Sequence, residues 1–325
     1  MPIRVGLIST AHVHAPAFAS SIIGNPKAEL VGIWDNEKER GETFAQKFDT
    51  HFTSDLNTLL NQVDAVAIAS ENIHHKAHIS AAISAKKHVL CEKPIAPNAA
   101  HAEEIAILAQ TEGLVLATAF PCPFSPNFEH AISRIENGDI GTILAVSTTN
   151  QGKCPFGWFT NPELSGGGSM IDHVVHVADL IRRLLGEDVA SVQAQTGNNH
   201  YSENCEDTAM VTVEFTNGVF VTIDSSWSKP PNSSTWGNVK LNMVGEKGII
   251  ELDLFCQGLV LTNQNGTSQV GTGSNLDAML FDNFFDAILG GVRPKSTLQD
   301  GLWASQIAIK AYESVAQAGA PAFIS

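Results

Sequence analysis

The sequence predicts an α/β protein with two domains, on three observations. Its 325 residues exceed what one ordinary hydrophobic core organises. The first third alternates short apolar segments with helical segments of roughly 10–15 residues, which is typical of βαβ units in a doubly wound parallel sheet. The second half is rich in strand-like segments separated by tight-turn signals such as Asn217-Gly218, which indicates antiparallel hairpins. We therefore expect an α/β domain followed by an α+β domain with a largely antiparallel sheet.

The alternation in the first domain can be assigned segment by segment. Buried parallel strands are expected where short apolar runs occur, at Ile3–Ser9, Leu30–Trp34, Ala65–Ala69, His88–Cys91 and Leu114–Thr118. Helices are expected between them, at Ala15–Ile23, Glu37–Phe48, His75–Ala85 and Ala99–Thr111. Ser54 is a plausible N-cap for a further short helix that runs to Leu60.

Three prolines at 121, 123 and 126 interrupt this rhythm, and we place the domain boundary there, with domains at 1–122 and 123–325. The helices expected in the second domain are Asn127–Glu136, Met170–Leu185, Leu276–Leu289 and Asp300–Ala318. The expected strands are Ile143–Thr149, Val189–Thr196, Thr208–Phe215, Val219–Trp227, Val239–Val244, Gly248–Leu252 and Leu259–Leu261.

Composition excludes several classes of function. The net charge of -15 leaves no basic stripe for nucleic acid or anionic lipid, so we expect neither partner. The acidic second half leaves neutral sugars or polyols open as small-molecule substrates. No apolar run reaches the roughly 18 residues of a membrane helix, and the N-terminus lacks the regions of a signal peptide. The five cysteines form no C-x-x-C pair, which is typical of reduced thiols in a cytoplasmic protein.

The turn after the first strand is where a Rossmann domain holds a dinucleotide pyrophosphate. At the position of the glycines of G-x-G-x-x-G, this chain has Ser9, Ala11 and His14. Serine and alanine are the smallest substitutes, so the backbone can still approach a phosphate. A histidine is harder to explain in the last position, because that glycine normally permits close packing of helix and strand.

Asp35 ends the second strand, about 20 residues beyond that turn. A carboxylate there accepts hydrogen bonds from the ribose hydroxyls of NAD. It would also repel a 2′-phosphate, so NAD is favoured over NADP. The alternative is that Asp35 caps the helix at Glu37–Phe48, and the two roles are compatible.

His12 and His14 also admit a metal interpretation, because H-x-H after a first strand begins the metal site of some hydrolases. Further histidines could complete such a site. Against this, the chain lacks H-E-x-x-H and has too few strand–helix repeats for a TIM barrel. In the plainer alternative, one imidazole lines the cofactor pocket and the other caps the helix. We expect no metal.

Lys93 follows the strand at His88–Cys91. Ligands bind outside the carboxyl ends of strands in a doubly wound sheet, which places this lysine at the cofactor crevice. It can donate a hydrogen bond to a substrate oxygen, and Pro94 fixes the turn that aims it. The alternative is a solvated surface charge.

A second cluster lies on the helix that follows the glycines at 166–168. Asp172, His176 and Asp179 are spaced i, i+4 and i+7 and share one helix face. A carboxylate one turn from an imidazole can orient the ring, which suits a general base. The glycines would let a ligand approach the backbone. The alternative is an amphipathic helix with a core histidine.

Together these segments resemble the glucose–fructose oxidoreductase / inositol 2-dehydrogenase (Gfo/Idh/MocA) family. The resemblance rests on Glu92-Lys93-Pro94 with its His88–Cys91 lead-in, on Gly-Gly-Gly…Asp172…His176…Asp179, and on Asn72 and His75 as Asn-x-x-His. It implies an N-terminal Rossmann domain and a C-terminal domain with a large, mostly antiparallel open sheet. The face of that sheet commonly forms a dimer or tetramer interface in the family.

The resemblance implies an NAD(P)-dependent dehydrogenase acting on CH–OH groups of a sugar or polyol. Lys93 would position the reacting hydroxyl, Asp172 would orient, and His176 would be the acid/base. The cofactor-binding residues would be Ser9, Thr10, Ala11, His12, His14, Asp35, Ser70, Asn72, His75, Glu92 and Lys93. The substrate-binding residues would be Lys93, Asn150, Trp158, Asp172, His173 and His176. Two alternatives remain: a non-catalytic ligand sensor of the same fold, and a metal-dependent hydrolase or lyase using His12 and His14.

Overall fold

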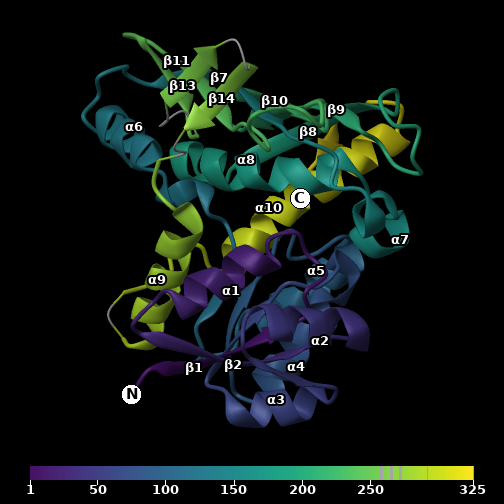
Figure 1. Cartoon of the computed structure of the whole chain (residues 1–325). Coiled ribbons are helices and arrows are strands. Elements are labelled where there is room, and N and C mark those ends of the chain that lie inside the picture. Colours follow the sequence, from purple (N-terminus) through teal and green to yellow (C-terminus); the bar gives the residue numbers. More distant parts are fainter. Residues whose placement is uncertain (256–258, 264–265, 271–272, 291, 325) are drawn as a thin grey trace. The chain divides into compact units, whose positions relative to one another are not determined.

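The structure is a computed structural model that describes residues 1–255, 259–263, 266–270, 273–290 and 292–324 (Figure 1). Two compact units make up the molecule. Unit 1 comprises residues 1–121, 164–166 and 276–302, and unit 2 comprises residues 122–163, 167–275 and 303–325. Each unit has its own sheet.

Unit 1 is built on a six-stranded parallel sheet of order β3-β2-β1-β4-β5-β6. Its strands are β1 (Ile3–Ile8), β2 (Ala28–Trp34), β3 (His51–Thr53), β4 (Ala65–Ile68), β5 (His88–Cys91) and β6 (Leu116–Thr118). The strand order reverses between β1 and β4, and in such sheets ligands bind beyond the carboxyl ends of the strands at this point. The doubly wound fold expected from the sequence is confirmed.

The helices of unit 1 follow the expected alternation closely. They are α1 (Ala15–Ile23), α2 (Lys38–Lys47), α3 (Leu56–Gln62), η1 (Asn72–His74), α4 (His75–Ser84), α5 (Ala99–Leu108) and α9 (Leu276–Ile288). The expected N-cap at Ser54 is wrong. Asp55 is the cap, because its carboxylate accepts hydrogen bonds from the backbone N–H groups of Asn57 and Thr58.

Unit 2 is built on a seven-stranded mixed sheet of order β12-β11-β7-β10-β9-β8-β15. Its strands are β7 (Ile143–Gln151), β8 (Val189–Gly197), β9 (Thr208–Phe215), β10 (Phe220–Ser226), β11 (Lys240–Gly245), β12 (Ile249–Asp253) and β15 (Ala322–Phe323). Only β7 and β10 pair in parallel, so the expectation of a mostly antiparallel sheet is confirmed. A separate hairpin consists of β13 (Leu259–Asn263) and β14 (Gly266–Val270).

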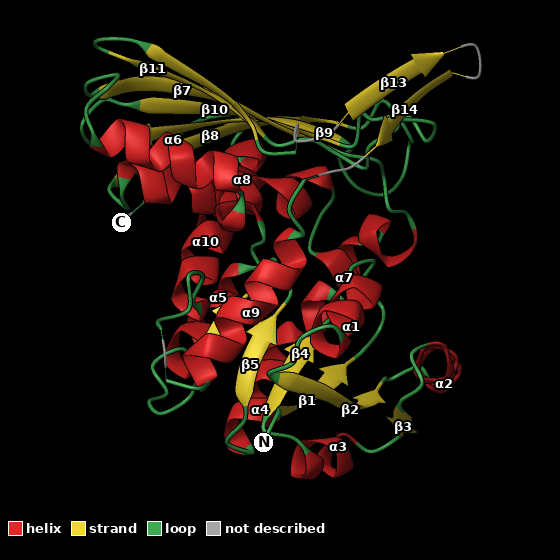
Figure 2. Cartoon of the chain, turned by 60° about the vertical axis from the view of Figure 1, so that its left-hand side comes forward, coloured by secondary structure: helices red, strands yellow, loops and turns green. Residues whose placement is uncertain are grey.

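The helices of unit 2 cover one face of the sheet, and that face carries buried apolar side chains. They are η2 (Cys122–Phe124), α6 (Pro126–Glu136), η3 (Gly157–Thr160), α7 (Pro162–Ser165) and α8 (Ser169–Leu185), while α10 (Leu298–Ala316) begins in unit 1 and ends in unit 2. Figure 2 shows α6 and α8 along one face of the sheet and no described helix on the other. Val146, Val211 and Ile223 are buried on the helix side, and alternate residues point the other way. No helix in the described part of the sequence is long and apolar enough to cross a membrane.

Candidate active site

The turn after β1 has the backbone conformation that the missing glycines would supply. Ser9 has φ = 65°, in the left-handed region that glycine usually occupies. Its hydroxyl accepts a hydrogen bond from the backbone N–H of Ala11 at 3.3 Å, and its own N–H donates to Trp34 O at 2.7 Å. The His12 N–H donates to Ala69 O at 3.0 Å. Local hydrogen bonds therefore hold the turn without glycine.

Asp35 fastens this turn to the end of β2. Its Oδ2 accepts hydrogen bonds from the backbone N–H and the hydroxyl of Thr10, at 2.8 and 2.7 Å. Its Oδ1 accepts from the backbone N–H of Glu37 at 2.8 Å, one residue before α2 begins. The predicted alternative of Asp35 as the helix N-cap is wrong, because Glu37 is the N-cap, although Asp35 does accept a hydrogen bond from the backbone N–H of Glu37.

Arg40 is a partner of Asp35 that the sequence analysis missed. Its guanidinium donates to Asp35 from Nε at 3.0 Å and from Nη2 at 2.7 Å. Burial alone would raise the pKa of Asp35, but the hydrogen bonds from Arg40, Glu37 and Thr10 lower it below its usual range. Asp35 is therefore ionised and paired with the guanidinium of Arg40. A ribose at this position would meet this ion pair, and not the lone negative charge that the sequence suggested.

Two buried polar atoms lie at the carboxyl end of β4. The amide of Asn72 donates from Nδ2 to Ser165 O at 2.8 Å, while its Oδ1 has no hydrogen-bond partner among the described residues. The same holds for Oε2 of Glu71, whose Oε1 lies 3.4 Å from Arg40 Nη1. Buried polar groups are normally satisfied, and ribose or amide groups of a dinucleotide would satisfy these two. The residues at this edge fit a nicotinamide dinucleotide.

His75 connects this edge to the turn after β5. Its ring nitrogens lie 2.8 Å from Pro94 O and 3.2 Å from Ser70 O. The ring is fully buried, and burial lowers its pKa. The hydroxyl of Ser70 lies 3.0 Å from Nδ1 of His78, whose burial lowers its pKa to about 3. The His75 ring thus lies between two backbone carbonyl groups, one in the turn after β4 and one in the turn after β5.

Lys93 is only 3% exposed, which is incompatible with the solvated surface charge considered as its alternative. The Lys93–Pro94 peptide is cis. The backbone N–H of Lys93 donates to Oε2 of Glu92 at 3.1 Å, so the carboxylate of Glu92 contacts the backbone of its own turn.

The other oxygen of Glu92 faces two histidines of the turn after β1. Its Oε1 lies 2.9 Å from Nδ1 of His14 and 3.5 Å from Nδ1 of His12. Burial alone would raise the pKa of Glu92, but the two imidazoles and Lys93 hold it far below its usual range. Burial alone would lower the pKa of His14, but Glu92 raises it. The ligand atoms of the three residues lie within 4.8 Å of one another, a spacing that a metal ion could bridge.

In unit 2, α8 presents the second set of candidate residues from a buried surface. Asp172 Oδ2 accepts a hydrogen bond from Trp227 Nε1 at 3.0 Å and lies 3.2 Å from Nε2 of His173. The ring of His173 packs on Gly152, where a Cβ would lie 2.8 Å from the ring carbon Cε1. His176 is buried one turn after Asp172. Sequence reasoning identified α8 but missed Trp227, which is 55 residues from Asp172.

Asp179, the third residue of the spaced set, has a structural partner. Its carboxylate accepts hydrogen bonds from Nε and Nη2 of Arg183 at 3.1 and 3.0 Å, and its side chain is fully buried. An i, i+4 pair of this kind stabilises the helix itself.

The glycines before α8 allow protein atoms, and not a ligand, to approach the backbone. A Cβ on Gly168 would lie 1.9 Å from Glu206 O, and a Cβ on Gly167 would lie 1.9 Å from Tyr312 Oη. Oε1 of Glu206 accepts hydrogen bonds from Gly168 N, Met170 N and Tyr312 Oη at 2.9, 3.0 and 2.6 Å. The expectation of ligand approach at these glycines is corrected accordingly, because Glu206 and Tyr312 fill that space.

Two predicted substrate residues lie elsewhere in unit 2. Asn150 on β7 is buried and donates from Nδ2 to Asn238 O at 3.0 Å, while its Oδ1 has no hydrogen-bond partner in the described residues. Trp158 stacks on Phe159 with ring centroids 3.9 Å apart.

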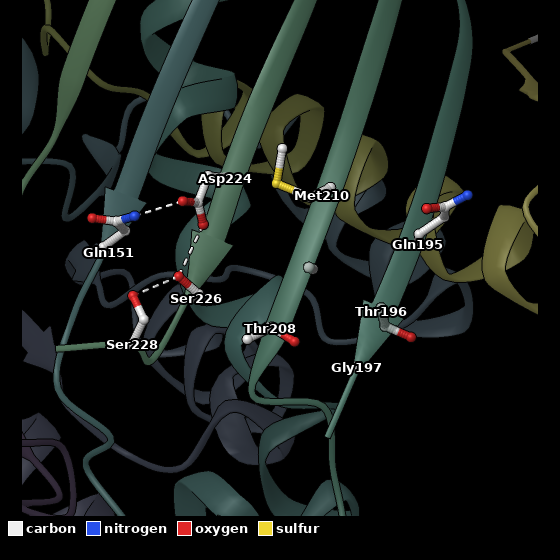
Figure 3. Close-up of a pocket in the computed structure, with 10 residues that line it drawn as sticks. Gln151, Gln195, Thr196, Gly197, Thr208, Met210, Asp224, Ser226 and Ser228 are labelled. Carbon is white, nitrogen blue, oxygen red and sulfur yellow. Dashed lines mark hydrogen bonds between the residues drawn. The ribbon is translucent and has the colours of Figure 1, made fainter. Parts of the chain in front are cut away.

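A shallow concavity of about 480 Å³ lies on the open face of the sheet in unit 2 (Figure 3). Most of the residues that line it are polar, and Gln151 donates to Asp224, which also accepts from Ser226. None of the candidate catalytic residues lines it.

The chain matches two sequence profiles that together span most of its length. Residues 3–120 match the oxidoreductase family with an NAD-binding Rossmann fold, and residues 128–251 match the GFO/IDH/MocA C-terminal domain. A D-glucoside 3-dehydrogenase of Escherichia coli K12 is 30% identical over 70% of this chain and 71% of its own length. A myo-inositol 2-dehydrogenase of Thermotoga maritima is 30% identical over 81% of this chain and 79% of its own length. The chain belongs to the Gfo/Idh/MocA family of oxidoreductases, as its motifs indicated.

Solved structures agree on the fold. The crystal structure of GenD2 from gentamicin A biosynthesis, in complex with NAD, superposes with a TM-score of 0.91 over 100% of this chain and 97% of that one, at 22% identity. Family membership does not support the predicted alternative of a metal-dependent hydrolase or lyase, although His12 and His14 do lie together.

Proposed function

We propose that this protein is an NAD-dependent dehydrogenase that oxidises or forms a CH–OH group of a sugar or polyol. The observation that carries the proposal is the burial of an ionisable set in each unit: Lys93 in unit 1, and Asp172 with His176 in unit 2. Ionisable side chains are seldom buried to this degree, and clusters of them are typical of active sites, so their burial favours a catalytic use. Relatives named as glucoside and inositol dehydrogenases support the substrate class.

Each of these residues has a distinct proposed role. Lys93 donates a hydrogen bond to the reacting oxygen and positions it. His176 removes the hydroxyl proton during oxidation and returns it in the reverse direction. Asp172, anchored by Trp227, fixes the electrostatic environment of the imidazoles on α8. When bound, the nicotinamide supplies the hydride chemistry.

Residues 1–122 bind the dinucleotide in this proposal, and residues 123–325 bind the substrate. The turn at Ser9–His14 receives the pyrophosphate, and Asp35 accepts the ribose hydroxyls, which favours NAD over NADP. Glu71 and Asn72 offer the buried oxygens described above, and Lys93 completes the cofactor crevice.

The substrate is proposed to contact Asn150, Trp158 and His173 in addition to Lys93 and His176. Asn150 supports this assignment because its buried amide oxygen lacks a partner among described residues, and a substrate hydroxyl would satisfy it.

Assembly into a homodimer or homotetramer through the sheet of unit 2 is part of the proposal. The face without helices carries exposed apolar side chains, including Met210, Phe220 and Val244. Exposed apolar patches on a sheet face are typical of interfaces. A cytoplasmic location is consistent with the four described cysteines at 91, 122, 154 and 205, which are free and buried.

The test is cofactor binding together with turnover. Wild-type protein is titrated with NADH and NADPH by fluorescence and then assayed with NAD on a panel of sugars and polyols. Lys93→Ala and His176→Ala are expected to lower kcat at least about 100-fold, as the loss of general acid–base catalysis does. Lys38→Ala and His130→Ala, both at exposed positions, are the matched controls.

No detectable affinity for either cofactor at millimolar concentration would refute the proposal. Binding of NADH without turnover of any panel member would instead favour the sensor alternative. Equal activity of wild type and His176→Ala would remove that residue from the mechanism.

A further inference from the structure

Unit 2 contains an aromatic pair, of one exposed and one partly buried ring, that the proposed catalytic roles do not use. Phe156, in the connection between β7 and η3, is 43% exposed. Its ring meets Tyr201 edge to face, with centroids 5.2 Å apart and an interplanar angle of 83°. Tyr201 belongs to the connection between β8 and β9, so two separate loops bring the rings together.

Both loops hold unusual backbone conformations beside these rings. Phe156 has φ = 56° and ψ = -163°, a region that is essentially restricted to glycine. The next residue, Gly157, has φ = 62°, and Ser202, which follows Tyr201, has φ = 56°. Such conformations persist only where the surroundings impose them, and they concentrate at ligand clamps and active sites.

The loop that carries Tyr201 is held by hydrogen bonds to one buried carboxylate. The carboxylate of Asp207 accepts hydrogen bonds from the backbone N–H groups of Asn199, His200 and Tyr201, at 3.2, 2.7 and 2.9 Å. Asp207 is itself 1% exposed. Tyr201 also packs on a buried cluster formed by Cys154, Phe159, Cys205 and Trp227. Tyr201 is therefore held by its backbone and by the buried cluster, while the ring of Phe156 is partly open to solvent.

The same buried cluster reaches the candidate catalytic residues. Trp227 belongs to it and donates its indole N–H to Asp172 at 3.0 Å. Tyr201 and Trp158 both pack against the cluster, and Trp158 is a predicted substrate residue. Within unit 2, contacts through Tyr201, the buried cluster and Trp227 thus connect the aromatic pair to the carboxylate of Asp172 on α8.

We propose that Phe156 and Tyr201 form an aromatic clamp that holds the C–H face of a six-membered ring, a pyranoside or a cyclitol, beside the reacting hydroxyl. The inference rests on the proposed function and narrows its substrate class. Such rings are amphipathic: their hydroxyls point outward and their axial hydrogens form an apolar face. The face of an aromatic ring is electronegative and attracts those C–H groups. An acyclic polyol lacks a fixed C–H face, so the clamp selects rings.

The experiment compares two ring probes, methyl β-D-glucopyranoside and myo-inositol, with an acyclic polyol, D-glucitol. KM and kcat are measured by NAD reduction, and binding of the same probes to the NADH complex is measured by calorimetry. Phe156→Ala is expected to raise KM, or weaken binding, roughly tenfold for the ring probe that the enzyme prefers, with kcat within about twofold. Phe156→Tyr keeps the ring and is expected to restore the wild-type KM.

Ile107→Ala is the control, because Ile107 is 72% exposed and lies on α5 of unit 1. NADH affinity should be unchanged in every variant, and so should the melting temperature of Phe156→Tyr. If wild type binds a ring probe in a Phe156-dependent way without turning it over, the clamp stands while the dehydrogenase proposal fails.

Three results would overturn the clamp: an unchanged KM in Phe156→Ala, an equal loss for D-glucitol, or no binding of either ring probe by a wild-type protein that binds NADH. A change in molecular mass by light scattering with KM unaltered would assign Phe156 to contact between copies of the protein, and would overturn it as well.

Discussion

The turn after β1 and the segment before α8 use glycine in opposite ways. The first is a place where glycines are expected for a ligand, yet Ser9 adopts the left-handed conformation and hydrogen bonds hold it. The second has three consecutive glycines, and the atoms that come close to Gly167 and Gly168 belong to Tyr312 and Glu206. A glycine pattern therefore reports a steric requirement without saying whether a ligand or the protein imposes it.

The largest effect is expected at Gly168, where the protein itself occupies the space beside the glycine. A Cβ there would meet a backbone oxygen at 1.9 Å, and backbone cannot move aside as a flexible side chain can. We expect Gly168→Ala to lower the free energy of unfolding by about 3 kcal/mol or more, measured by urea denaturation. Gly138→Ala is the control, because it has a positive φ but open space, and should cost about 1 kcal/mol. Equal losses in the two variants would contradict the packing explanation.

The next largest effect is expected at Asp35, which ties the turn to β2. Asp35→Asn removes the carboxylate that Thr10 and Arg40 contact and leaves the guanidinium beside the ribose site. NADH should bind about tenfold more weakly, since a hydrogen bond to a charged group contributes roughly 1.5–3 kcal/mol. NADPH should bind more tightly, because an arginine accommodates a 2′-phosphate.

Fluorescence titrations with both cofactors measure this change, and Glu37→Gln, at an exposed position near Arg40, is the control. An unaltered ratio of NADH to NADPH affinity would show that Asp35 does not face the ribose.

A smaller effect should follow from returning the glycine to the turn. Ser9→Gly relieves the left-handed conformation but loses the hydroxyl and adds freedom to the unfolded state, so the unfolding free energy should change by less than about 1 kcal/mol. NADH affinity should stay the same or improve. Lys86→Gly, at an exposed residue with φ = 59°, is the control for conformation alone. A large loss of NADH affinity in Ser9→Gly would show that the hydroxyl itself binds the cofactor.

Much of the fold was predictable because its signals are local. Helix α1 and strand β5 have the bounds that apolar periodicity indicates, and the Asn217-Gly218 turn joins β9 to β10. Strand β3 was not predicted, because its three residues at the sheet edge are too few to show a pattern. Ser54 was preferred to Asp55 as a helix cap because both are good cap residues, and only the backbone geometry separates them.

The candidate site was predictable only where its residues share a segment. Lys93 and His176 lie in motifs that can be recognised along the sequence. Arg40, Glu206 and Trp227 were missed because folding alone brings them to their partners, across gaps of 5, 36 to 38 and 55 residues. The roles assigned to the predicted site residues stay predictions until the variants above are measured.

The smallest predicted effect concerns the other unusual residue of the turn, His14. Its pKa is raised by Glu92, so the pair stabilises the fold fully below the ordinary histidine pKa of about 6.5. That contribution is lost as pH rises through the higher folded-state pKa. At the acid end the pKa of Glu92 is lowered, so its contribution is lost as pH falls from about 4.5.

The stability difference between wild type and His14→Ala should therefore be largest between about pH 4.5 and 6.5 and should shrink above it. Because the His14 side chain is 37% exposed, solvent screening keeps the change modest. Urea denaturation across pH measures it, with His130→Ala as the control, and a difference that grows above pH 7 would contradict the ion pair.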